Sequence, residues 1–137
     1  MIKSDFNHQT GFLDSRFFGK VNLKEIIDYI NSTKNNGTLP RILKILTDAT
    51  SATFEIETND LNKIVEANNQ SVEQYDYIID AIVLESPKEM ALSILYNWLK
   101  IKNTFSKYSQ PGKLPLPGYQ AFSLNKVKLT KNFSFVR

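Results

Sequence analysis

Hydroxyl side chains gather around one carboxylate in the stretch "ILTDATSAT", where Asp48 is followed by Thr50, Ser51 and Thr53. Such a group can serve as a phosphoacceptor in a regulatory loop or as a polar ligand site at the end of a strand. It can also be structural, because Asp, Ser and Thr side chains bond to their own backbone in turns. The sequence favours the structural interpretation and keeps a partner or ligand site as the alternative.

Residues that commonly carry catalysis are scarce. The chain has no cysteine and a single histidine, His8, with no serine or aspartate motif that points to it. The carboxylates of Glu55, Glu57 and Asp60 lack the spacing of a calcium loop, and no phosphate-binding glycine motif is present. We therefore expect a protein that is not an enzyme, with no catalytic residue, no cofactor and no metal site.

The bulk composition indicates one soluble domain that spans residues 1–137. The chain is 42% apolar, its net charge is only +3, and it contains no apolar run long enough to span a membrane. A cytoplasmic location and no specific nucleic-acid partner are the matching expectations.

Charge is unevenly distributed along the chain, because all fourteen acidic residues lie at or before Glu89. The remainder carries only basic charges, at Lys100, Lys102, Lys107, Lys113, Lys126, Lys128, Lys131 and Arg137. This asymmetry predicts either a face that attracts anionic partners or lysines scattered over solvated surfaces.

The first half of the chain predicts a β-hairpin, a helix and a buried strand. The hairpin strands fall at about 2–8 and 11–18, and Asn22 with Glu25 forms a capping box that opens the helix. The β-branched and leucine-rich stretch "PRILKILTDA" is typical of a central strand that ends just after Asp48.

The second half predicts a helix over "TNDLNKIVEANNQ", capped by Thr58 or Asn59, and a buried strand within "YDYIIDAIVLES". "SPKE" then combines Ser86 and Glu89 as a capping box with proline at the first helical position, which opens a helix over about 87–107. This helix is expected to pack across the sheet through an apolar stripe formed by Ala91, Ile94, Leu95, Trp98, Leu99 and Phe105.

The C-terminal stretch is less regular. Residues 109–118, "SQPGKLPLPG", predict a loop, with a polyproline ligand for another domain as the alternative. "YQAFS" is a short strand candidate, and residues 124–137 fit either a strand or the preferred short helix to about 131. The fold class is then α/β, a single domain of order ββαβαβαβ(α) with a mixed, mostly parallel sheet of about five strands.

Several segments taken together resemble the SpoIIAA-like domains, small bacterial proteins that are grouped with the STAS fold and the related CRAL-TRIO lipid-binding fold. They are "GKVNLKEI", the strand that ends at Asp48, "DAIVLESPKEMAL" and "YQAFS". The resemblance implies a partner-binding loop after Asp48 that holds Thr50, Ser51 and Thr53. The usual Asp-Ser-Ser/Thr-Gly acceptor motif is absent, so this loop is expected to act without the family's usual phosphorylation.

Two candidate surfaces follow. Asp48 and Glu85 are expected at the carboxyl ends of neighbouring strands, where open α/β sheets bind ligands. Aromatic residues of the third helix are expected to form a dimer face or core packing, or, as the lipid-binding relatives imply, an apolar pocket; these are Trp98, Tyr96, Phe105 and Tyr108.

The predicted function is a protein-interaction or regulatory module that associates with itself as a homodimer or with another protein. The alternative is a small carrier for an apolar or anionic, lipid-like ligand. An internal cavity would favour the carrier, and a large flat apolar face would favour the interaction module.

Overall fold

The computed structural model describes residues 1–108, with side chains placed as far as Lys100. Its elements, in chain order, are β1 (Ile2–Asn7), β2 (Phe12–Asn22), α1 (Leu23–Asn35), β3 (Ile42–Glu55), α2 (Asp60–Val72), β4 (Tyr77–Val83) and α3 (Pro87–Tyr108). The α/β class and the order of these seven elements are as predicted. The predicted loop at 109–118, strand at 119–123 and C-terminal element at 124–137 lie outside the described residues.

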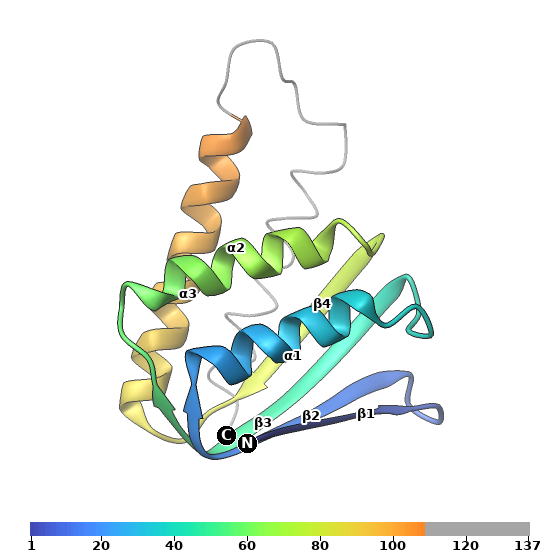
Figure 1. Cartoon of the computed structure of the whole chain (residues 1–137), viewed down its shortest axis with the longest axis horizontal. Coiled ribbons are helices and arrows are strands. Elements are labelled where there is room, and N and C mark those ends of the chain that lie inside the picture. Colours follow the sequence, from blue (N-terminus) through green and yellow to red (C-terminus); the bar gives the residue numbers. More distant parts are fainter. Residues whose placement is uncertain (109–137) are drawn as a thin grey trace.

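The described strands form one mixed sheet in the order β1-β2-β3-β4 (Figure 1). β1 pairs with β2 in antiparallel register, and β2, β3 and β4 are parallel to one another. Residues 1–108 thus contribute four strands where about five were expected, since the remaining strand candidate falls beyond them.

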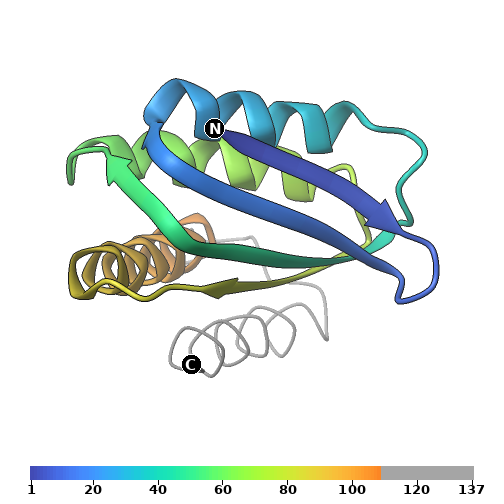
Figure 2. The ribbon, with the colours of Figure 1, turned by 90° about the horizontal axis from the view of Figure 1, so that it is seen from below.

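Two helices cover one face of this sheet. α1 and α2 lie side by side above the strands, and α3 packs against α2 on the side of the sheet away from β1 (Figure 2). On the opposite face, Ile42 and Leu46 of β3 remain 57% and 41% exposed, so no helix of residues 1–108 buries them. We call this opposite face of the sheet the open face.

β3 is longer than predicted because a bulge interrupts it rather than ends it. The register with β2 pairs Arg16 with Asp48 but Phe18 with Ser51, so β3 carries one extra residue between these pairs. The strand then continues to Glu55 with the bulky side chain of Phe54 buried. The prediction that the strand ends just after Asp48 was wrong, because the bulge breaks the alternation by which a strand is recognised.

The ends of the helices show where local signals decide structure. The Asn22 side chain accepts the backbone N–H of Glu25, and the Glu25 side chain accepts the N–H of Asn22, as predicted. Asn59 stands at the start of α2 but makes no capping hydrogen bond, and Asp60 accepts the N–H of Glu57 instead.

The apolar stripe predicted for α3 is only partly correct. Leu95 and Leu99 are half-buried against the core, whereas Ile94 and Trp98 are 51% and 55% exposed. The helix turns its Glu89 and Asn97 side chains inward, and both are buried. The buried face of α3 therefore includes two polar residues that the apolar stripe does not predict.

Candidate functional site

A cavity of about 170 Å³, partly open to solvent, lies between the helices and the sheet. Most of its wall is apolar, and these side chains come from β2, β3, β4, all three helices and two connecting segments: Phe17, Ile26, Ile30, Ile45, Phe54, Ile56, Leu61, Ile64, Val72, Ile78, Ile82, Leu84 and Leu92. Its polar wall consists of Tyr29, Thr33, Thr47, Asn68, Ser71, Asp80, Glu89, Ser93, Tyr96 and Lys100. A concave apolar wall with a few converging polar groups is the usual form of a small-molecule site.

A polar patch of Tyr29 from α1 and Thr47 from β3 lines one part of the cavity, and Ser15 of β2 lies next to this patch but is not part of the wall. Ser15 of β2 and Thr47 of β3 are directly paired in register, buried, and face the helices. The Tyr29 hydroxyl of α1 lies 2.7 Å from Ser15 Oγ. Burial raises the pKa of Tyr29 to about 12, against the effect of its hydrogen bond with Ser15, and the charge of Asp80 adds to the rise. Tyr29 is therefore a neutral hydrogen-bonding group at the cavity wall.

Among the residues that line the cavity, Asp80 of β4 is exposed, and we call this part of the cavity its mouth. Asp80 pairs in register with the buried Ile45, so its side chain faces the helices, yet it is exposed. Asn68 Nδ2 donates to Tyr96 Oη at 2.6 Å and joins α2 to α3. Lys100 Nζ lies 5.8 Å from the centre of the Tyr96 ring, a cation–π contact. The cavity wall thus includes one exposed carboxylate, from Asp80, and one half-buried ammonium, from Lys100.

Glu89, near the start of α3, also lines the cavity, and this residue is only 3% exposed. It accepts the backbone N–H of Phe54 at 3.3 Å and a short hydrogen bond from the Ser86 hydroxyl. Burial would raise the pKa of Glu89, but these bonds, its own backbone N–H and the charge of Lys88 together bring it below its ordinary value. Lys88 Nζ also donates to the Phe54 carbonyl at 3.1 Å. Side chains of α3 thus bind both the backbone N–H and the backbone carbonyl of Phe54, which fixes α3 to β3.

The cluster of hydroxyl side chains around Asp48 lies within β3 and not in a loop. Thr50 donates to Asp48 Oδ1 through its backbone N–H at 3.1 Å and its hydroxyl at 2.7 Å. These bonds, the hydroxyl first, lower the pKa of Asp48, and Arg16 Nε lies 4.0 Å from Asp48 Oδ2. The structural interpretation of Asp48 is supported, since these local bonds stabilise the bulge.

The loop expected after Asp48 is therefore not present. Thr50, Ser51 and Thr53 are exposed residues of the strand, and the next helix begins only at Asp60. The position expected for the family's phosphoacceptor at a helix start is consequently occupied by a strand. The hydroxyls are excluded from the cavity wall, which lies on the other side of the sheet.

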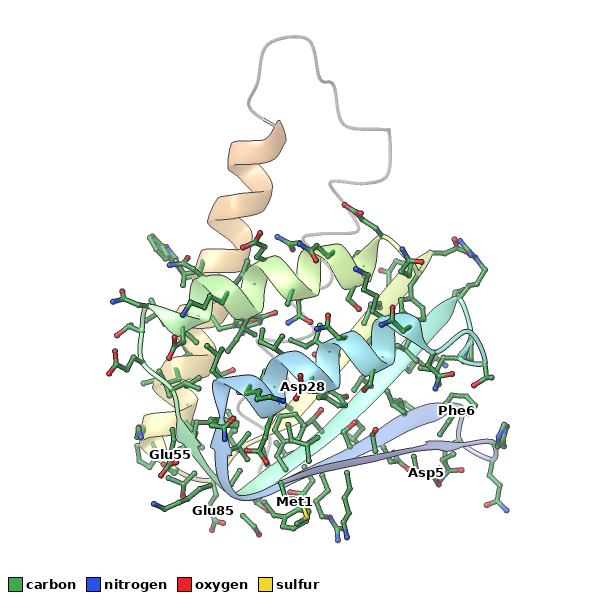
Figure 3. The ribbon with its side chains drawn as sticks, viewed as in Figure 1. Met1, Asp5, Phe6, Asp28, Glu55 and Glu85 are labelled. Carbon is green, nitrogen blue, oxygen red and sulfur yellow. The ribbon has the colours of Figure 1, made fainter. Side chains whose placement is uncertain are left out.

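Asp48 and Glu85 were expected together at strand ends. Asp48 pairs with Val83, the last residue of β4, and Glu85 follows two residues later as an exposed side chain. Figure 3 shows Glu85 and Glu55 at the same end of the sheet, opposite the end that holds Phe6. The carboxylates of Asp48 and Glu85 are thus both level with the carboxyl end of β4, although neither lines the cavity.

Of the four aromatic residues predicted for a pocket or dimer face, Tyr96 lines the cavity and Trp98 does not. The side chains of Phe105 and Tyr108 lie outside the described part of α3. The sequence reasoning missed Tyr29 and Asp80. A charged residue in the middle of the apolar run "YIIDAIV" was the available signal, because a buried strand seldom includes one without a role.

Within residues 1–108, no group of three or more potential ligand side chains is arranged to hold a metal ion. In the same part of the chain, no helix is long and apolar enough to cross a membrane.

The fold and the cavity define a small α/β domain with a partly open cavity beneath its helices. Comparisons with protein-family models, with curated proteins and with solved structures find no match to this chain. The likeness to the SpoIIAA-like domains accordingly stays a prediction from the sequence.

Proposed function

We propose that this domain is a non-enzymatic carrier or sensor that binds a small, mostly apolar molecule in the cavity between its helices and its sheet. The observation that carries the proposal is the cavity itself, which measures about 170 Å³. It is partly open to solvent, so a small molecule can reach its apolar wall.

The size of the cavity limits the ligand. An engineered protein cavity of about 150 Å³ lined by Leu, Ile and Phe stays dry and binds benzene. The present cavity is comparable and opens to solvent at Asp80, so a ring or short chain can enter with a polar group left near the mouth. A long acyl chain exceeds the volume, which narrows the lipid-like ligand expected from the sequence to a smaller molecule.

A substitution that fills the cavity tests this proposal. Ser93 is a half-buried lining residue of α3, and Ser93→Phe places a ring where the ligand is expected. We expect toluene and indole to raise the melting temperature of the full-length wild-type protein and to leave that of Ser93→Phe unchanged. Differential scanning fluorimetry and ligand-observed NMR measure these two effects.

The matched control is Ser32→Phe, the same change at an exposed position of α1. This variant should respond to the ligands as the wild type does. The proposal would be overturned if neither probe raised the wild-type melting temperature or gave a binding signal in ligand-observed NMR. Binding of the probes to Ser93→Phe as tightly as to the wild type would also overturn it.

A second candidate, the self-associating interaction module, is favoured by the open face. Ile42 and Leu46 are exposed there, and Lys44 lies between them in the sequence. The Lys44 Nζ atom is 5.8 Å from the centre of the Phe12 ring. Asp14 is directly paired with Leu46 on the same face. Apolar side chains bordered by charges of both signs suit a self-complementary contact between two copies.

The double variant Ile42→Lys/Leu46→Lys tests this second candidate. Sedimentation velocity should show a concentration-dependent dimer for the wild type and a monomer for the double variant, because two added charges oppose burial of the face. Thr53→Lys, an exposed position further along β3, is the control and should dimerise normally. A wild-type protein that stays monomeric at every concentration tested would contradict self-association.

A further inference from the structure

The charged side chains of the cavity wall already interact with other groups of the protein. Glu89 is buried, its oxygens accept hydrogen bonds, and the positive charge of Lys88 acts on it. Asp80 and Lys100 also make interactions within the chain, and Lys100 Nζ lies over the Tyr96 ring. A charged ligand would therefore lose its hydration without gaining an uncompensated charge in the described part of the wall, which costs free energy. An uncharged ligand meets no such cost.

Several neutral hydroxyls lie around the hydroxyl of Tyr29. Ser15 Oγ is 2.7 Å from it, and the side chains of Thr33 and Thr47 also interact with it. Thr33, Thr47 and Tyr29 line the cavity, whereas Ser15 lies outside the wall. Because burial raises the pKa of Tyr29 to about 12, its hydroxyl keeps its proton at neutral pH. We call Tyr29, Thr33 and Thr47 the hydroxyl cluster of the wall.

The hydrogen bonds already made limit what the hydroxyl cluster can offer a ligand. Thr33 Oγ1 donates its hydrogen to the Tyr29 carbonyl at 3.0 Å, so this oxygen can only accept further bonds. Tyr29 and Ser15 share one hydrogen bond, which uses the hydrogen of one hydroxyl and leaves that of the other for another acceptor. The cluster thus retains acceptor positions and a donor. A hydroxyl is the smallest neutral group that both donates and accepts.

Aromatic side chains of the wall lie next to the hydroxyl cluster. The Phe17 ring packs edge-on against Tyr29, with ring centres 5.3 Å apart, and against Phe54 at 6.3 Å. All three residues line the cavity. Aromatic rings favour such edge-to-face contacts with one another, so this part of the wall suits an aromatic ligand.

We propose that the cavity selects a small uncharged aryl alcohol or phenol, with its ring in the apolar wall and its hydroxyl bonded to the hydroxyl cluster. This inference rests on the proposed binding function and adds the class of ligand to it. Tyr29 is the residue that sets the preference, because its hydroxyl stands among those of Ser15, Thr33 and Thr47.

Four probes of similar size test the inference by isothermal titration calorimetry on the full-length protein. They are 2-phenylethanol, 2-phenylethylamine, 3-phenylpropionate and ethylbenzene, which are a neutral alcohol, a cation, an anion and a hydrocarbon at neutral pH. The alcohol is expected to bind about tenfold more tightly than either charged probe, because neither charge finds an uncompensated partner in the wall.

Tyr29→Phe separates recognition of the hydroxyl from simple burial of the ring. This variant should bind 2-phenylethanol about three- to tenfold more weakly and ethylbenzene within about twofold of the wild type, since only the alcohol loses a hydrogen bond. Thr47→Val removes a second hydroxyl of the cluster and should act in the same direction. It keeps the test available if Tyr29→Phe fails to fold, which circular dichroism would show.

Tyr75→Phe is the matched control. Tyr75 is a buried tyrosine outside the cavity wall, and its hydroxyl donates to the Thr33 carbonyl. The same change at this position should leave the affinities for all four probes intact.

The outcomes separate this inference from the proposed function. The alcohol assignment would be overturned, with the cavity proposal left standing, if either charged probe bound as tightly as the alcohol. Alcohol affinity that is unchanged in both Tyr29→Phe and Thr47→Val would have the same consequence. Absence of binding by all four probes, together with no response to toluene and indole, would overturn both proposals.

Discussion

Leu43→Ala is expected to destabilise the domain by about 2–5 kcal/mol, the range for removal of a fully buried leucine side chain. Leu43 has no exposed surface and lies in the smaller core cluster with Leu13, Ile45 and Tyr75. The loss combines the transfer free energy of the deleted carbons with the cavity that they leave. Urea unfolding followed by circular dichroism measures it.

Leu46→Ala provides the matched control, because it makes the same change three residues along β3 on the open face. Leu46 is 41% exposed, so we expect a loss below about 1 kcal/mol in the monomer. Equal losses for the two variants would mean that the open face is buried in solution, which would support its contact with a partner.

Glu89→Ala is expected to cost about 2–4 kcal/mol, because it leaves the buried N–H of Phe54 unpaired and removes the acceptor of the Ser86 hydroxyl. Glu85→Ala changes an exposed glutamate four residues earlier, before the start of α3, and should alter the free energy of unfolding by less than about 0.5 kcal/mol. Chemical denaturation of both variants gives the comparison. A Glu89→Ala protein as stable as the wild type would show that the carboxylate does not fix α3 to β3.

The same residue predicts a pH dependence. The pKa of Glu89 in the folded protein lies below its ordinary value of 4.5, so the unfolded chain binds the proton more readily. The stabilisation is therefore complete above about pH 4.5 and is lost as the pH falls through the lower folded pKa. Glu89→Gln should lack this component, so the difference in stability between it and the wild type should shrink as the pH is lowered. A difference that stays constant with pH would contradict the assignment.

The sequence predicted the elements of the fold where local chemistry decides them. The Asn22–Glu25 capping box and the proline after Ser86 fix two helix starts within a few residues, and both helices begin as expected. The length of β3 was not predictable in this way, because the hydrogen bonds from Thr50 to Asp48 are those of a turn. The pairing of β2 with β3 on both sides of the bulge keeps this segment extended.

The candidate site was harder to predict than the fold. The sequence predicts Tyr96 as an aromatic residue of a pocket or dimer face, and Tyr96 does line the cavity. Tyr29, Thr47 and Asp80 come from three elements, and their meeting depends on strand order and on the approach of α1 to the sheet. The local sequence around each of the three residues does not indicate that their side chains lie close together, so the polar patch is recognised only in the folded structure.

The attachment of α3 to β3 also covers part of a strand edge. β3 extends past its last pairing with β4, at Asp48 and Val83, as far as Glu55. The peptide groups of such an overhang are a template on which a strand of another molecule can add. At Phe54 the N–H and the carbonyl are already occupied by Glu89 and Lys88. The start of α3 therefore occupies the peptide groups of Phe54 that a strand of another molecule would otherwise need for pairing.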